Sequence, residues 1–145
     1  MTPGAGIGEH IHAQCEEMFF GIDNTMHYIH NGRKIEVPGP AFVVCHAGES
    51  HGIFNPTETD TRWFNFNCCL PGQTYDATDL HPSDDAESER ASRESMELEP
   101  NSDRIPVGRF DRALLRPLAQ APHGGKGRVL YREVYGQQDF RSMFA

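Results

Sequence analysis

The sequence predicts an all-β domain, a barrel of short strands that carries one acidic, partly helical or irregular excursion. Three features support this: a tight-turn signal, runs of alternating residues, and histidines spaced two apart. Asn31-Gly32 lies between two strand-like runs and favours a type I′ hairpin turn. Residues 61–70 alternate between aromatic and polar side chains, as expected when successive side chains face opposite sides of a strand. A length of 145 residues fits one domain with a single core.

The strands can be placed in chain order from apolar runs and the breakers between them. Glycine and proline clusters, such as the one at residues 38–40, end one run before the next begins. Beyond the hairpin, strands are expected over residues 10–14, 17–23, 41–45, 52–54 and 61–70.

The overall charge limits the class of function. The net charge is -8 at pH 7, so a nucleic-acid phosphate backbone is a poor partner. The sequence contains no apolar run near the ~20 residues of a membrane helix. The N-terminus lacks the basic and apolar layout of a signal peptide. We therefore expect a cytoplasmic protein that binds neither nucleic acid nor membranes.

Four residues have the chemistry of a divalent-metal site. His10 and His12 are two apart and share one face of their predicted strand. Glu17 opens the next apolar run and can sit opposite them, and His51 follows a turn further along the chain. Three imidazoles and one carboxylate suit Fe, Mn, Ni, Co or Zn, and the ligand types do not choose among these ions. We predict one divalent ion inside the barrel.

The spacing of these residues resembles the two motifs of the cupin superfamily. The matching segments are Gly4-x5-His10-x-His12-x4-Glu17-x6-Asn24 and Gly48-x2-His51-x3-Asn55. Asn24 replaces the usual glycine of the first motif, and asparagine tolerates the left-handed conformation that glycine supplies. His46 replaces the usual proline of the second motif. The resemblance covers roughly the first half of the chain and implies a jelly-roll β-barrel of the cupin type.

The resemblance also implies a function. Metal-binding cupins include dioxygenases, isomerases, decarboxylases and lyases, so the expected role is a metal-dependent enzyme acting on a small organic molecule. The alternative is a non-catalytic module that binds a small ligand or assembles with another cupin. Within the ligand set, Glu16 is the rival of Glu17, because the family tolerates one residue of variation here. Glu17 keeps the family's spacing to Asn24.

Two side chains of the predicted hairpin are candidate acid–base residues. If the alternation holds from Thr25 to Val37, Tyr28 and His30 share one face. The family resemblance makes that face the inner one, where either group can act as an acid or a base. The alternative is that both are ordinary strand residues near the barrel mouth.

The inner face of residues 61–70 remains open. Asn65 and Asn67 share one face of this strand, and Phe64 and Phe66 share the other. The sequence does not decide which face lines the pocket.

Cysteine spacing argues against a zinc cluster or a disulfide framework. Cys15, Cys45, Cys68 and Cys69 show no Cys-x2-Cys pair and no repeated spacing. We therefore predict free thiols in a reducing compartment. Cys15 lies between His12 and Glu17 and is a doubtful extra ligand.

Composition divides the chain into three parts. Residues 1–70 hold both motifs and form the barrel core, residues 71–104 form an acidic excursion or lid, and residues 105–145 supply C-terminal strands. Between Asp76 and Asp103 lie ten acidic and two basic residues. We expect that segment to be the most mobile part of the chain.

The acidic segment also carries a helix signal. Serine is a good N-cap and acidic residues suit the first turn, so a helix is expected from Ser83 to about Leu98.

The last third of the chain predicts strands again. Residues 128–135 and Phe140 to Ala145 have strand character, and residues 110–116 suit a strand or a helical turn. By resemblance, the chain looks like the first half of a two-cupin protein, or like a single cupin with an attached C-terminal strand. An open barrel edge needs covering, so we expect a homodimer with Phe140 to Ala145 at its interface.

Overall fold

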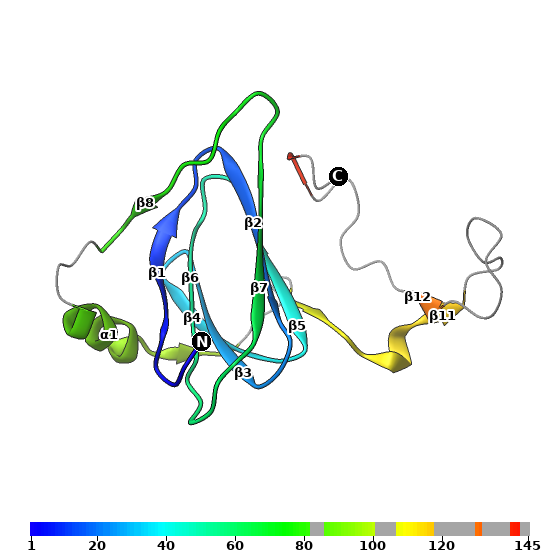
Figure 1. Cartoon of the computed structure of the whole chain (residues 1–145), viewed down its shortest axis with the longest axis horizontal. Helices are drawn as coiled ribbons and strands as arrows, with labels where there is room; N and C mark the ends of the chain where they lie inside the picture. The colour runs from blue at the N-terminus through cyan, green and yellow to red at the C-terminus, as the bar shows by residue number, and fades with distance from the viewer. Residues whose placement is uncertain (82–85, 101–106, 118–129, 132–139, 143–145) are drawn as a thin grey trace.

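A computed structural model of the protein describes residues 1–81, 86–100, 107–117, 130–131 and 140–142. Within these ranges the chain forms a sandwich of two mainly antiparallel β-sheets (Figure 1). One short helix, α1 (Ala86–Ser95), lies beside the six-stranded sheet. The prediction of an all-β fold with a partly helical excursion is confirmed.

The first sheet has six strands in the order β8-β1-β6-β3-β4-β9. Their bounds are β1 (Gly6–Ile11), β3 (Thr25–His30), β4 (Arg33–Pro38), β6 (Ser50–Phe54), β8 (Thr78–Asp79) and β9 (Leu98–Glu99). The four inner strands come from the first 54 residues, and two short strands from the acidic segment form both edges.

The second sheet has four strands in the order β10-β5-β2-β7. Their bounds are β2 (Cys15–Gly21), β5 (Ala41–Cys45), β7 (Trp63–Cys69) and β10 (Val107–Arg109). A 3₁₀ turn, η1 (Arg112–Leu114), follows, and β11 (Arg116–Pro117) pairs with β12 (Leu130–Tyr131) away from the sandwich (Figure 1). Of the strand or helical turn expected over residues 110–116, the structure has a helical turn at Arg112–Leu114, and a strand begins only at Arg116.

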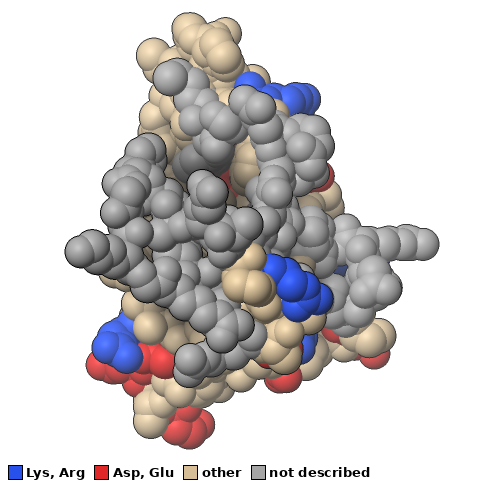
Figure 2. Space-filling view, turned by 90° about the vertical axis from the view of Figure 1, so that its right-hand side faces the viewer, with Lys and Arg blue, Asp and Glu red and all other residues tan. Residues whose placement is uncertain are grey.

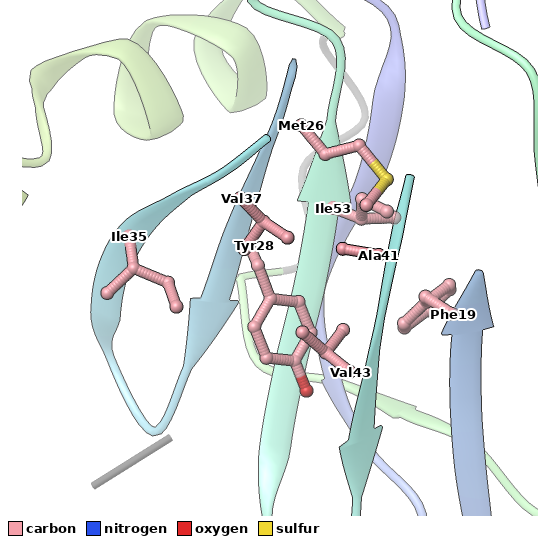
Figure 3. Close-up of a cluster of buried hydrophobic side chains, with 8 residues drawn as sticks. All are labelled: Phe19, Met26, Tyr28, Ile35, Val37, Ala41, Val43 and Ile53. Carbon is pink, nitrogen blue, oxygen red and sulfur yellow. The ribbon is translucent and has the colours of Figure 1, made fainter. Parts of the chain in front are cut away.

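Alternating side chains from both sheets fill the space between them. Figure 3 shows this cluster, made of Phe19, Met26, Tyr28, Ile35, Val37, Ala41, Val43 and Ile53. Each is at most 2% exposed. Because side chains largely alternate between the two faces of a strand, the core also fixes which polar residues share the inner face.

Two asparagines adopt the backbone conformations that the sequence predicts. Asn31 and Gly32 have φ of 49° and 73°, as a type I′ hairpin turn requires at both central residues. Asn24 has φ of 58°, so it supplies the left-handed turn where the family motif has glycine.

A β-bulge in β1 directs the first histidine inward. Against β6, the register runs from Ile7 opposite Ile53 to His10 opposite His51, one residue more on β1 than on β6. The extra residue lets Ile7 and His10 both face the interior, which strict alternation would forbid. Gly52 permits the bulge, since a Cβ there would lie 3.0 Å from the carbonyl oxygen of Ile7.

The acidic segment is joined to the first sheet at both ends. Helix α1 ends at Ser95 rather than Leu98, because Leu98 and Glu99 form β9 and pair with β4. Arg33 of β4 forms an ion pair with Glu99. The predicted start of the helix at Ser83 lies outside the described residues.

The described part of the C-terminal segment is not a strand, contrary to expectation. Arg141 and Ser142 form a bend, and their backbone N–H groups donate to the Glu16 carboxylate. These N–H groups are therefore bound to the buried Glu16 carboxylate and not to the backbone of a neighbouring strand. Apart from Leu130 and Tyr131, the strand expected over residues 128–135 lies outside the described residues, and the homodimer stays a prediction.

The prediction of free thiols is wrong for two cysteines. Cys15 and Cys69 form a disulfide between β2 and β7, and Cys45 and Cys68 are free. Cys15 and Cys69 are direct partners in the antiparallel register of these strands. A pairing across the sheet leaves no signal in the spacing of cysteines along the chain, which is why the sequence did not indicate it.

The described surface shows no single charged patch on the face drawn in Figure 2, where lysine and arginine side chains lie in separate groups. Among the described helices, none has the length and apolar character needed to cross a membrane.

Candidate metal centre

The two sheets bring the predicted ligands together between them. His10 of β1 and His51 of β6 are direct register partners in the six-stranded sheet. His12 follows β1, which ends at Ile11 and is thus shorter at this end than expected. Glu17 of β2 faces them from the other sheet.

The four side chains converge on one carboxylate oxygen. Glu17 Oε2 lies 2.9 Å from His12 Nε2 and 3.6 Å from His10 Nε2, and it also contacts His51 Nε2. One ligand atom from each of the four residues lies within 4.8 Å of the others. All four residues are buried, with exposures of 7% or less.

Hydrogen bonds at the outer nitrogens of two imidazoles orient this cluster so that it could hold a cation. The Nδ1–H of His10 donates to the carbonyl oxygen of Gly8 at 2.8 Å, and that of His12 donates to the carbonyl oxygen of Asp76. Such bonds leave the Nε2 lone pairs directed at Glu17, and a carboxylate only accepts. Lone pairs that face one another repel, and protons or a metal ion between them offset that repulsion. The donor set therefore fits a divalent ion.

Asp76 also holds the loop that carries His12. Its carboxylate accepts hydrogen bonds from the backbone N–H of Ala13 at 2.7 Å and of Gln14 at 3.0 Å. The segment before β8 thus fixes the chain just after the second histidine. The sequence analysis assigned Asp76 to the acidic excursion and missed this contact, which links residues more than sixty positions apart.

The close contacts within the cluster shift the pKa values of Glu17 and two of the histidines. Burial opposes ionisation of Glu17, but the histidines, chiefly His10 and His51, hold its pKa well below the usual range. The hydrogen bond with Glu17 raises the pKa of His10, whereas burial lowers the pKa of His51. The Glu17 carboxylate is therefore ionised, and its charge favours the protonated form of His10.

Two asparagines complete the inner face of the site. Asn65 and Asn67 of β7 both donate to Glu17 Oε1, the latter at 3.0 Å. The open question about residues 61–70 is settled, because the face with the asparagines is the inner one. Phe64 and Phe66 lie on the outer face and are 53% and 47% exposed.

The rival ligands lie elsewhere. Glu16 is fully buried on the opposite face of β2, where it accepts from His46 Nδ1 at 2.9 Å. Cys15 shares the inner face with Glu17, but its sulfur is bonded to Cys69 and is not a free thiol ligand.

The two candidate acid–base residues are both on the inner face, at different depths. Tyr28 is fully buried in the hydrophobic core, and its hydroxyl has no hydrogen-bond partner among the described residues. His30 pairs in register with His51 and is 8% exposed. His30 Nε2 lies 3.4 Å from Glu49 Oε2. The inner-face placement confirms the alternation, and catalytic roles for both residues remain predictions.

Comparison with known proteins gives a limited result. No protein-family model matches this chain, and no curated protein matches it. Among solved structures, the chain is similar to YhhW from Escherichia coli, with 22% sequence identity and a TM-score of 0.43. That match covers 57% of this chain and 39% of the other, so this chain spans well under half the length of YhhW.

Proposed function

We propose that this protein is a cupin-type metal protein in which His10, His12, Glu17 and His51 bind one divalent ion. The observation that supports the proposal is the convergence of three buried imidazole nitrogens on Glu17 Oε2. The resemblance to the two cupin motifs supports it independently, because it rests on spacing along the chain.

We further propose that the site is that of an enzyme acting on a small organic molecule, of the dioxygenase, isomerase or lyase type. A bound Fe, Mn, Ni, Co or Zn ion supplies a Lewis acid that polarises a substrate oxygen or activates a small molecule. The protein supplies four buried ligands and a defined orientation for two of the imidazoles.

We infer that a small molecule reaches the site past β7. Asn65 and Asn67 lie on the inner face and are nevertheless exposed, because β7 is the edge of its sheet. Tyr75 is 61% exposed, and its ring centroid lies 5.2 Å from that of His12. A small molecule that enters here meets amide and phenol groups before it reaches the ligands.

His30 is the better placed of the two acid–base candidates. It lies on the strand next to His51, and the partly exposed Glu49 faces its Nε2. The Nδ1 atom of His30 is buried and has no partner among the described residues. The contact with Glu49 gives His30 a carboxylate partner, which supports an acid–base role for His30.

Elemental analysis of protein purified without added metal tests the metal site. We expect about one ion per chain in the wild type and little in His51→Ala, with an unchanged far-UV circular dichroism spectrum. His81→Ala is the matched control, because His81 is 65% exposed and lies outside the cluster. Full occupancy in His51→Ala would contradict the ligand assignment.

Turnover separates an enzyme from a binding or assembly module. The metal-loaded protein is tested for oxygen uptake and product formation with a panel of small phenols and organic acids, before and after chelation. We expect turnover that chelation abolishes and metal restores. Binding of a panel compound with no turnover would favour the non-catalytic module.

A further inference from the structure

The two oxygens of the Glu17 carboxylate have different surroundings. Oε2 faces the three imidazoles of the candidate metal centre. Oε1 accepts hydrogen bonds from the side-chain amides of Asn65 and Asn67. Glu17 is 2% exposed, so these groups replace the water that would otherwise solvate Oε1. The structure thus separates a ligand oxygen from an oxygen held by the protein.

The strand register produces this arrangement. Asn67 lies directly opposite Glu17 in the pairing of β7 with β2, and Asn65 is two residues away on the same face. Asn67 Nδ2 also donates to Asn65 Oδ1 at 2.9 Å, which links the two amides. Because a carboxylate only accepts hydrogen bonds, both amides must turn their nitrogen atoms towards Glu17.

We propose that Asn65 and Asn67 are positioning residues that make Glu17 a monodentate metal ligand. This inference rests on the proposed metal site and says how that site keeps room for substrate. A carboxylate that binds through both oxygens occupies two positions on an ion. With Oε1 engaged by two N–H donors, Glu17 would occupy one position on the ion and leave the other available to a substrate oxygen.

Cobalt(II) reports the coordination number through the strength of its d–d absorption, which weakens as ligands are added. We expect the double variant Asn65→Leu/Asn67→Leu to show a weaker and shifted band than the wild type, because Glu17 can then bind through both oxygens. Leucine has the same branched arrangement of side-chain heavy atoms as asparagine and no N–H donor. Loss of such a supporting shell also typically lowers metal affinity 10–100-fold.

The matched control is Phe64→Leu/Phe66→Leu on the same strand. These side chains lie on the outer face, so the cobalt spectrum and affinity should equal those of the wild type. Single variants that each restore one asparagine should give intermediate spectra. An Asn65→Leu/Asn67→Leu protein with the wild-type spectrum would overturn the positioning role, whatever its affinity.

A second measurement needs no metal. In the ¹⁵N NMR spectrum of the metal-free protein, the side-chain amide signals of Asn65 and Asn67 should move in Glu17→Gln and stay in place in Glu36→Gln. Unmoved signals in Glu17→Gln would also overturn the positioning role, even if the wild type binds cobalt. A wild type that binds no cobalt would instead overturn the proposed function, and monodentate binding with it.

Discussion

Glu16 and Glu17 are consecutive residues of β2, and their carboxylates are buried on opposite faces of the sheet. Glu17 faces three histidines. Glu16 accepts hydrogen bonds from the backbone N–H of Ser142 at 2.8 Å and from His46 Nδ1 at 2.9 Å. One residue of register therefore separates a candidate metal ligand from an anchor for the C-terminal segment.

This relationship predicts that Glu17→Gln and Glu16→Gln have different effects on metal content and stability. Glu17→Gln should lose most of the bound metal, because an amide oxygen is a weaker ligand than a carboxylate. Glu16→Gln should keep the metal but lose about 1.5–3 kcal/mol of stability, since hydrogen bonds to a charged group are lost. Metal content and urea denaturation measure the two effects. A Glu16→Gln protein that loses metal while Glu17→Gln keeps it would reverse the assignment.

Metal affinity should fall as the pH is lowered. The interaction with Glu17 raises the pKa of His10 above its ordinary value, so the metal-free site holds a proton at higher pH than a free imidazole does. A metal ion must displace that proton, and the competition grows as pH falls through the raised pKa.

The expected slope is about tenfold in affinity per pH unit for each proton displaced. Zinc affinity measured by chelator competition between pH 8 and pH 5.5 gives this slope. His81→Ala should show the same slope as the wild type, because His81 lies outside the cluster. A zinc affinity that is constant over this range would contradict His10 as a ligand.

The local pattern indicated which histidines lie together in the candidate metal centre. His10 and His12 are two residues apart, which predicted that they share one face of a strand. Asn31, followed by glycine, predicted the hairpin turn. Glu17 could be chosen over Glu16 only through the family's spacing, because alternation alone does not say which face of β2 is inner. The bulge that turns His10 inward left no sequence signal, although Gly52 makes room for it.

Contacts across the sheets could not be predicted in this way. Asn65 and Asn67 join the site through the register of β7 against β2, which depends on how the sheets pack. The strands β8 and β9 have two residues each, too few to show alternation. Asp76 was assigned by its charge to a solvated segment, yet its carboxylate caps two backbone N–H groups beside His12.

His30 and Tyr28 should differ in their effect on turnover. His30→Gln should lower the rate 10²–10⁴-fold, the usual contribution of a general acid or base, with metal content unchanged. Tyr28→Phe should leave the rate within a few-fold of the wild type, because the hydroxyl lies in the core. The readout is oxygen uptake or product formation with the panel compound that gives turnover. Equal losses in both variants would favour a catalytic role for Tyr28.

The disulfide between Cys15 and Cys69 predicts both a thiol count and a change in stability. Of the four cysteines, two should react with an alkylating reagent in the unfolded, unreduced protein, and all four after reduction. Mass spectrometry counts the added groups. Alkylation of all four without reduction would contradict the disulfide.

Replacing both bonded cysteines with serine should lower the free energy of unfolding by about 2–4 kcal/mol, because the bond closes a loop between residues 54 positions apart. Cys68→Ser is the matched control, since Cys68 is a free neighbour on the other face of β7. The bond also joins β2 to β7 two residues from the Glu17–Asn67 pair. The double serine variant should therefore bind metal more weakly than Cys68→Ser. The reason is that no covalent bond then holds β2 and β7 in the register that places Asn67 opposite Glu17.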